Sequence, residues 1–102
     1  MNRSDILNTA REYITKDRAA THGEAEDSFD AISSGWQWWM EVRRPGPLCA
    51  FDTAMMMVIF KAARMAGNQA HIDNAIDLCG YAALAGEIGA IQAQERAQEI
   101  WC

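Results

Sequence analysis

The fold that we expect for this chain follows from residues 51–81, FDTAMMMVIFKAARMAGNQAHIDNAIDLCGY. They begin with an apolar segment that carries one acid, Asp52, near its start. A turn-like AGNQ follows, and then a second segment that opens with His71, Asp73 and Asp77. Apolar residues in both segments recur at the spacing of an amphipathic helix. The stretch therefore predicts two packed helices with acids on facing stripes.

Length and composition limit the class of protein. The chain has 102 residues, half of them hydrophobic, with four Trp and six Met. This is enough for one domain with one core but leaves little margin, so we expect self-association. Fourteen acids against nine Lys and Arg give a net charge of −5, which argues against general binding to nucleic acids. A local basic cluster or a bridging cation would still allow a nucleotide to bind.

Cysteine spacing and hydropathy predict a soluble, cytoplasmic protein. Cys49, Cys79 and Cys102 are odd in number and show no CxxC spacing, which fits reduced thiols better than a disulfide framework. The first residues are polar where a secretory signal has an apolar core. The longest apolar run, residues 54–60, is too short to span a bilayer, so we expect no membrane association.

The apolar periodicity predicts an all-α fold of four main helices in an antiparallel bundle, forming a single domain. The helices are expected at about residues 5–15, 24–42, 48–65 and 71 onward. Ser4 is the expected N-cap of the first helix. Arg43 and Arg44 suit the C-terminus of the second, and the prolines that follow end it. The long last helix exceeds what one small core needs, so a homodimer or larger assembly is expected.

Two residues of the second helix stand out from its apolar stripe. Gly35 lowers helix propensity by about 1 kcal/mol relative to Ala, so we expect it to permit close packing against a neighbour. Trp38 lies off the stripe that holds Trp36, which indicates a dimer contact or a stacking platform.

Asp52 is out of place on a stripe that it shares with methionines. An unpaired buried carboxylate is costly, so Asp52 needs a partner, a metal ion or a role in helix capping. Because Asp52 falls in the first turn of its helix, capping and a functional role both remain open.

Further charged residues occur near the expected turn between the last two helices. Lys61 and Arg64 lie one turn apart. They are either ordinary surface charges near a helix C-terminus or contacts for a phosphate group. Asp73 and Asp77 are four residues apart and repel each other unless Lys61, Arg64 or a divalent cation lies between them.

Four blocks of the chain resemble a family of small phage and prophage proteins. They are KDRAATHG at 16–23, SFDAI at 28–32 with tryptophans after it, DTAMMMVIFKAARMA at 52–66 and AHIDNAIDLCGYAAL at 70–84. The resemblance covers about residues 6–84 and implies no established activity. The family pattern maps onto Asp17, Arg18, His22, Gly23, Phe29, Asp52, Lys61, Arg64, His71, Asp73, Asp77, Gly80 and Tyr81. Thr21 and Ser28 depart from it.

More distantly, the acid-bearing helices resemble the MazG-like nucleotide pyrophosphohydrolases. That resemblance implies Mg²⁺ held by acids from two helices and cleavage of a nucleoside triphosphate. The EExxE spacing is absent, and the acids are instead Glu24, Glu26, Asp27 and Asp30 on one helix and Asp73 and Asp77 on another. Nucleotide binding is therefore favoured over hydrolysis.

Three hypotheses follow. The first is a Mg²⁺-dependent nucleotide pyrophosphohydrolase with Asp52, Asp73 and Asp77 as catalytic metal ligands. The second is a non-catalytic phage protein that sequesters a nucleotide signal in the host cytoplasm. The third is an acidic protein that binds and inhibits a host defence system. The ligand-binding residues expected for the first two are Arg18, His22, Trp36, Lys61, Arg64, His71 and Tyr81.

Overall fold

The computed structural model of the protein describes the backbone of residues 1–17 and 25–98 and the side chains of residues 1–15 and 27–96. The described backbone is helical throughout its regular elements and contains no strand. The elements are α1 (Arg3–Glu12), a π-helical turn η1 (Tyr13–Asp17), α3 (Ala25–Val42), α4 (Ala50–Gly67) and α5 (Ile72–Gln98). The prediction of an all-α fold with four main helices is confirmed, and the predicted boundaries fall within about three residues of these.

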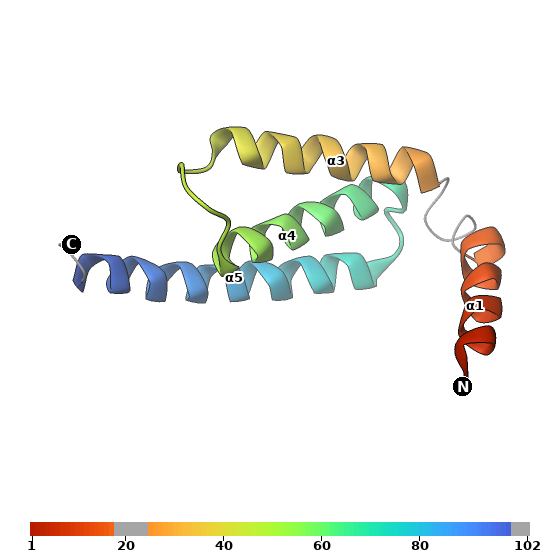
Figure 1. The fold of residues 1–102 in the computed structure, drawn as a ribbon. Helices are drawn as coiled ribbons and strands as arrows, with labels where there is room; N and C mark the ends of the chain where they lie inside the picture. The colour runs from red at the N-terminus through yellow and green to blue at the C-terminus, as the bar shows by residue number, and fades with distance from the viewer. Residues whose placement is uncertain (18–24, 99–102) are drawn as a thin grey trace.

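Helix α4 is the centre of the packed part of the molecule (Figure 1). It runs antiparallel to α3, so that the indole Nε1 of Trp36 donates a hydrogen bond of 2.8 Å to the carbonyl of Met56. On its other side α4 runs antiparallel to α5, where the ring of Phe51 lies against Gly89. Each pair is a helical hairpin joined by a short connection. Both hairpins follow from apolar stripes that neither neighbour can bury alone.

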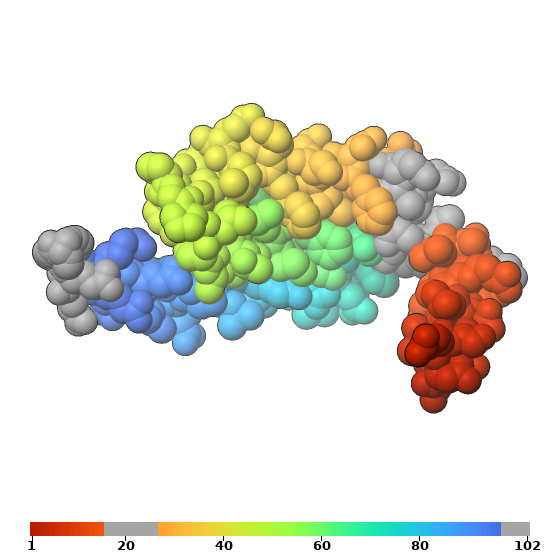
Figure 2. All heavy atoms as spheres, in the orientation of Figure 1, coloured from red at the N-terminus to blue at the C-terminus, as the bar shows by residue number. Residues whose placement is uncertain are grey.

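Helix α1 does not join the other three, which corrects the predicted bundle of four helices. Figure 2 shows it projecting from the body as a separate lobe. None of its residues is buried, and Ile6 and Leu7 of its apolar stripe are 54% and 68% exposed. The amphipathic pattern therefore predicted the helix correctly, but it did not predict what the apolar face of α1 contacts.

Local capping explains where α1 begins. The side chain of Asn2 accepts a hydrogen bond of 2.9 Å from the backbone of Asp5. The carboxylate of Asp5 accepts one of 3.1 Å from the backbone of Asn2. This reciprocal pair is a capping box, so the predicted cap, Ser4, is wrong by two positions and lies inside the helix.

The core is small because the three packed helices form a layer rather than a closed bundle. The buried apolar residues in the described part are Ile32, Ala54 and Ala85. Gly35 permits close approach, as predicted, because a Cβ atom there would collide with Cγ2 of Ile59. In the described residues, no helix is both long enough and apolar enough to cross a membrane.

Candidate functional site

The carboxylate of Asp52, at the start of α4, is fully buried. Two nitrogens of the Arg43 guanidinium donate hydrogen bonds to it, Nε to Oδ1 at 2.9 Å and Nη2 to Oδ2 at 2.9 Å. The indole Nε1 of Trp39 donates to Oδ1 at 3.1 Å, and the backbone N–H of Cys49 donates to Oδ2 at 2.9 Å. Bidentate, charge-assisted pairing of this kind is stronger than hydrogen bonding between neutral groups.

These contacts fix the charge state of Asp52. The hydrogen bonds from the Arg43 guanidinium hold the pKa of Asp52 well below its usual range. Burial acts in the opposite direction, and the backbone N–H of Cys49 adds to the lowering. Asp52 is therefore an ionised residue that ties the loop after α3 to the start of α4. Of the roles open from the sequence, the structure shows a charged partner and helix capping.

The structure does not bring Asp52 together with Asp73 and Asp77. Asp77 pairs with Lys61, which lies nine residues after Asp52 in α4, about 13 Å along the helix axis. In the described side chains, no group of three or more His, Cys, Asp or Glu residues is placed to hold a metal ion. The physical reason is that both Asp52 oxygens face donors from α3 and its loop.

A second polar cluster lies where α4 ends and α5 begins. Nζ of Lys61 lies 3.0 Å from Oδ2 of Asp77, with side-chain exposures of 17% and 48%. A shallow hollow of about 460 Å³ adjoins this pair. It is lined by Ile76, Asp77, Gly80, Tyr81 and Leu84. We call Lys61, Asp73, Asp77 and Tyr81 the Lys61–Asp77 cluster, since Asp73 is exposed one turn before Asp77 on the same helix.

Two more predicted residues lie near this end of the helical pair. The guanidinium carbon of Arg64 lies 4.6 Å from the centre of the Phe60 ring, and Nζ of Lys61 lies 5.3 Å from it. Both distances suit cation–π contacts. His71 is half-buried in the turn between α4 and α5, where its carbonyl accepts a hydrogen bond of 3.1 Å from the backbone of Asn74.

Trp36 does not join the cluster. Trp36 lies in the interface of α3 and α4, where Met56 accepts its indole hydrogen bond, so its apolar stripe serves packing. Arg18 and His22 lie outside the described residues.

Sequence reasoning missed three residues of structural or chemical interest. Arg43 and Arg44 were interpreted as charges at a helix C-terminus, although Arg43 pairs with Asp52 and Arg44 lies 3.5 Å from it. The sequence did contain a signal for this pair, because an acid on the apolar stripe in the first turn of α4 needs a cation, and Arg43 and Arg44 lie in the segment just before it. Asn74 is 2% exposed, and its Nδ2 makes no hydrogen bond within the described part.

Comparison with known proteins places the chain among phage proteins. It is 35% identical over 77 residues to the gene 55 protein of Mycobacterium phage L5, a match that covers 76% of this chain and 47% of that protein. The chain thus spans about half the length of this curated relative. No solved structure matches. The predicted resemblance to a phage family of unknown function is confirmed, while the similarity to MazG-like enzymes stays a prediction. A family model, that of a domain of unknown function, DUF6378, matches residues 5–89, and the chain belongs to this family.

Proposed function

We propose that this protein binds a nucleotide at the Lys61–Asp77 cluster. The observation that carries the proposal is the 3.0 Å contact of Lys61 with Asp77 beside a hollow that Tyr81 lines. It unites residues from α4 and α5 that the family pattern also contains. A lysine, a pair of acids and an aromatic ring at a hollow match the phosphate, cation and base of a nucleotide.

The cluster suits a magnesium–nucleotide complex better than a free metal ion. Mg²⁺ usually keeps several waters and is bound by one or two carboxylates together with substrate phosphates. Asp73 and Asp77 lie one helical turn apart in α5, so one cation can meet both carboxylates when the phosphates complete its coordination. Lys61 would then exchange its contact with Asp77 for a phosphate oxygen, with Arg64 one turn further along α4.

The size of the hollow is compatible with this ligand class. Its volume of about 460 Å³ falls within the roughly 300–1,000 Å³ of small-molecule sites. One side is open, so the base would stack on Tyr81 while the phosphates reach Lys61. Pyrophosphohydrolysis requires more of the site than binding does, because a water molecule must also be positioned for attack. Sequestration of a nucleotide signal requires binding only.

The test is a panel of nucleoside triphosphates and cyclic nucleotides, measured by thermal shift and calorimetry with and without Mg²⁺ and assayed for pyrophosphate release. We expect Mg²⁺-dependent stabilisation by at least one compound. Asp77→Asn and Lys61→Met should each weaken its binding about tenfold or more, which corresponds to about 1.4 kcal/mol. Asp30→Asn, a change of an exposed acid on α3, is the matched control and should leave the affinity unchanged.

The outcomes separate the hypotheses. Turnover that needs Mg²⁺ and is lost in Asp77→Asn would establish the enzyme. Stabilisation without pyrophosphate release would establish sequestration. Stabilisation by no compound, or binding that survives both cluster variants, would overturn the proposal.

Protein binding is the second candidate function, and it includes the inhibition of a host defence system. Trp38 and Val42 are four residues apart on α3, and each is 55% exposed. Exposed aromatic side chains such as that of Trp38 are enriched at protein contacts. We also propose that the protein self-associates, since exposed apolar residues extend along α5.

A further inference from the structure

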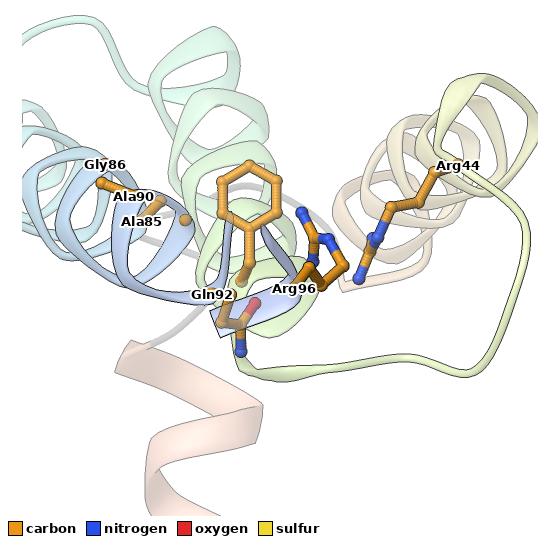
Figure 3. Close-up of a pocket in the computed structure, with 8 residues that line it drawn as sticks. Arg44, Ala85, Gly86, Ala90, Gln92 and Arg96 are labelled. Atoms are coloured by element: carbon orange, nitrogen blue, oxygen red, sulfur yellow. The ribbon is translucent and has the colours of Figure 1, made fainter. Parts of the chain in front are cut away.

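A second hollow lies at the other end of the α4–α5 pair, where the loop after α3 meets the C-terminal half of α5 (Figure 3). Its volume is about 380 Å³. Its polar lining comes from Arg44, Gln92 and Arg96, and its apolar lining comes from Phe51 and small residues of α5. Gln92 follows Asp77 by fifteen residues, about 22 Å along α5. The hollow is therefore separate from the Lys61–Asp77 cluster.

The floor of this hollow is apolar and firmly placed. A Cβ atom at Gly89 would lie 3.0 Å from Cδ2 of Phe51, so the ring packs directly onto the backbone of α5. Trp39 contacts the same ring edge-on, with ring centres 6.0 Å apart. A Cβ atom at Gly86 would meet nothing within 4 Å. The hollow thus exists because α5 carries no large side chain at these positions.

The Asp52 network positions the cationic side of the hollow. Nη2 of Arg44 lies 2.8 Å from Sγ of Cys49, and its Nη1 lies 3.5 Å from Oδ2 of Asp52. Sγ of Cys49 also lies 3.3 Å from Oε1 of Gln92. The Cys49 thiol therefore contacts both Arg44 and Gln92, two residues that line the hollow. Since Arg43 already neutralises Asp52, Arg44 adds positive charge to this region.

Two arginines from distant parts of the chain line this hollow. Figure 3 shows the side chains of Arg44, from the loop after α3, and of Arg96, from α5, at the same hollow. Two guanidinium groups that line one hollow can each form a charge-assisted contact with a bound anion, whatever other partners they have. Arginine is well suited to phosphate because its planar group binds two oxygens at once. On a chain with a net charge of −5, such a basic hollow is a distinct local feature.

We infer that this hollow binds a small phosphorylated molecule, with the phosphate between Arg44 and Arg96 and an apolar or aromatic part on the Phe51 floor. Gln92 would orient the phosphate ester through its amide. The site requires no metal ion and does not depend on the function of the Lys61–Asp77 cluster. Free phosphate and a phosphate ester share the same headgroup chemistry, and the floor distinguishes them, because only an ester has an apolar part to bury.

The experiment is calorimetric titration of the full chain with phenyl phosphate, inorganic phosphate and phenol at low ionic strength. We expect phenyl phosphate to bind at least fivefold more tightly than inorganic phosphate and phenol to show no binding. Arg44→Gln and Arg96→Gln should each weaken phenyl phosphate at least tenfold. Arg11→Gln, which changes an exposed arginine of α1, is the matched control.

Gly86→Leu is a test that leaves both arginines in place. A Cβ atom at Gly86 would meet nothing within 4 Å, and leucine suits a helix, so the variant should fold and place its side chain in the hollow. It should abolish binding of phenyl phosphate and spare the nucleotide response of the Lys61–Asp77 cluster. Binding that survives Gly86→Leu and both arginine variants, or no binding of phenyl phosphate even at millimolar concentration, would overturn the inference. Equal affinity for inorganic phosphate and phenyl phosphate would overturn the role of the Phe51 floor.

Discussion

Asp52 and Arg43 show how one ion pair organises the junction of two helices. Their side chains are 0% and 6% exposed, so neither charge is screened by water. Nη1 of Arg43 donates a hydrogen bond of 2.8 Å to the carbonyl of Gly46. Nη2, which also bonds Asp52, donates one of 2.9 Å to the carbonyl of Pro47. The same arginine thus shapes the loop and anchors the start of α4. Asp52 supports Arg44 of the second hollow without needing to touch a ligand.

The first prediction concerns the loss of this pair. We expect Asp52→Asn to lower the free energy of unfolding by about 3–5 kcal/mol, because it leaves the Arg43 charge buried without its partner. Urea denaturation followed by circular dichroism measures this loss. Asp30→Asn, at an exposed position, should change stability by less than about 0.5 kcal/mol. Equal effects of the two variants would mean that the pair does not stabilise the fold.

The second prediction concerns acid. The ordinary pKa of an aspartate is 3.8, and that of folded Asp52 is lower. Below this ordinary value the unfolded chain takes up a proton that the folded chain does not, so stability falls as the pH decreases. The slope for one proton approaches about 1.4 kcal/mol per pH unit. The contribution is complete above about pH 5.

The measurement is urea denaturation at a series of pH values from about 5 to about 2. The natural chain should lose stability more steeply over this interval than Asp52→Asn, which has no carboxylate to titrate at this position. Parallel slopes for the two proteins would contradict a lowered pKa for Asp52.

At the scale of the elements, the contact of α3 with α4 depends on Gly35. The Ile59 side chain occupies the space where a Cβ atom at Gly35 would lie. Gly lowers helix stability by about 1 kcal/mol relative to Ala, so its presence here is explained by the approach of the two helices. Gly80, on the outer face of α5, has no such neighbour.

The third prediction compares these two glycines. Gly35→Ala should destabilise the protein by about 1–2 kcal/mol, because overpacking outweighs the gain in helix propensity. Gly80→Ala should stabilise it by about 0.5–1 kcal/mol, because only the propensity changes. Thermal and urea denaturation measure both effects. Stabilisation by Gly35→Ala equal to that by Gly80→Ala would show that α3 and α4 do not approach as closely as described.

At the scale of the whole molecule, much apolar surface is left uncovered. The accessible surface is 7190 Å², whereas a compact monomer of this mass exposes about 5,800 Å². The radius of gyration is 17.3 Å, against about 13 Å for a compact domain of this length. The excess of roughly 1,400 Å² is larger than the roughly 800 Å² that each partner buries in a standard protein interface. A second copy of the chain is the occupant expected from the sequence.

The fourth prediction locates that contact. Ile76 and Leu84 are 60% and 53% exposed on α5 and border the hollow beside Tyr81. We expect light scattering to show a dimer or larger assembly, and Ile76→Asp with Leu84→Asp to shift it to the monomer. Gln94→Asp, which changes an exposed polar residue of α5, should leave the assembly intact. A natural chain that is monomeric at high concentration would contradict the expectation.

How far the sequence predicted the site depended on the range of each interaction. The pairing of Asp77 with Lys61 was foreseen as one of several solutions, because two acids four residues apart require a cation nearby. The metal site of three aspartates was not found in the described residues, because Asp52 turns toward α3. No sequence pattern predicted that Arg44 and Arg96 line the same hollow. Two helical hairpins bring them there, and no local pattern of residues reports how hairpins pack.

From the sequence we predicted the helices of this protein, their approximate ends, the close approach at Gly35 and the resemblance to a phage protein family. The helices and their ends depend on periodicity and on breaking residues, which act within a few positions along the chain. Three features became visible only once the helices were packed: α1 stands outside the packed helices, Arg43 pairs with Asp52, and two separate hollows lie along α5. Each of these results from which apolar faces meet, and that is set by the free energy of burying whole surfaces rather than by any local segment.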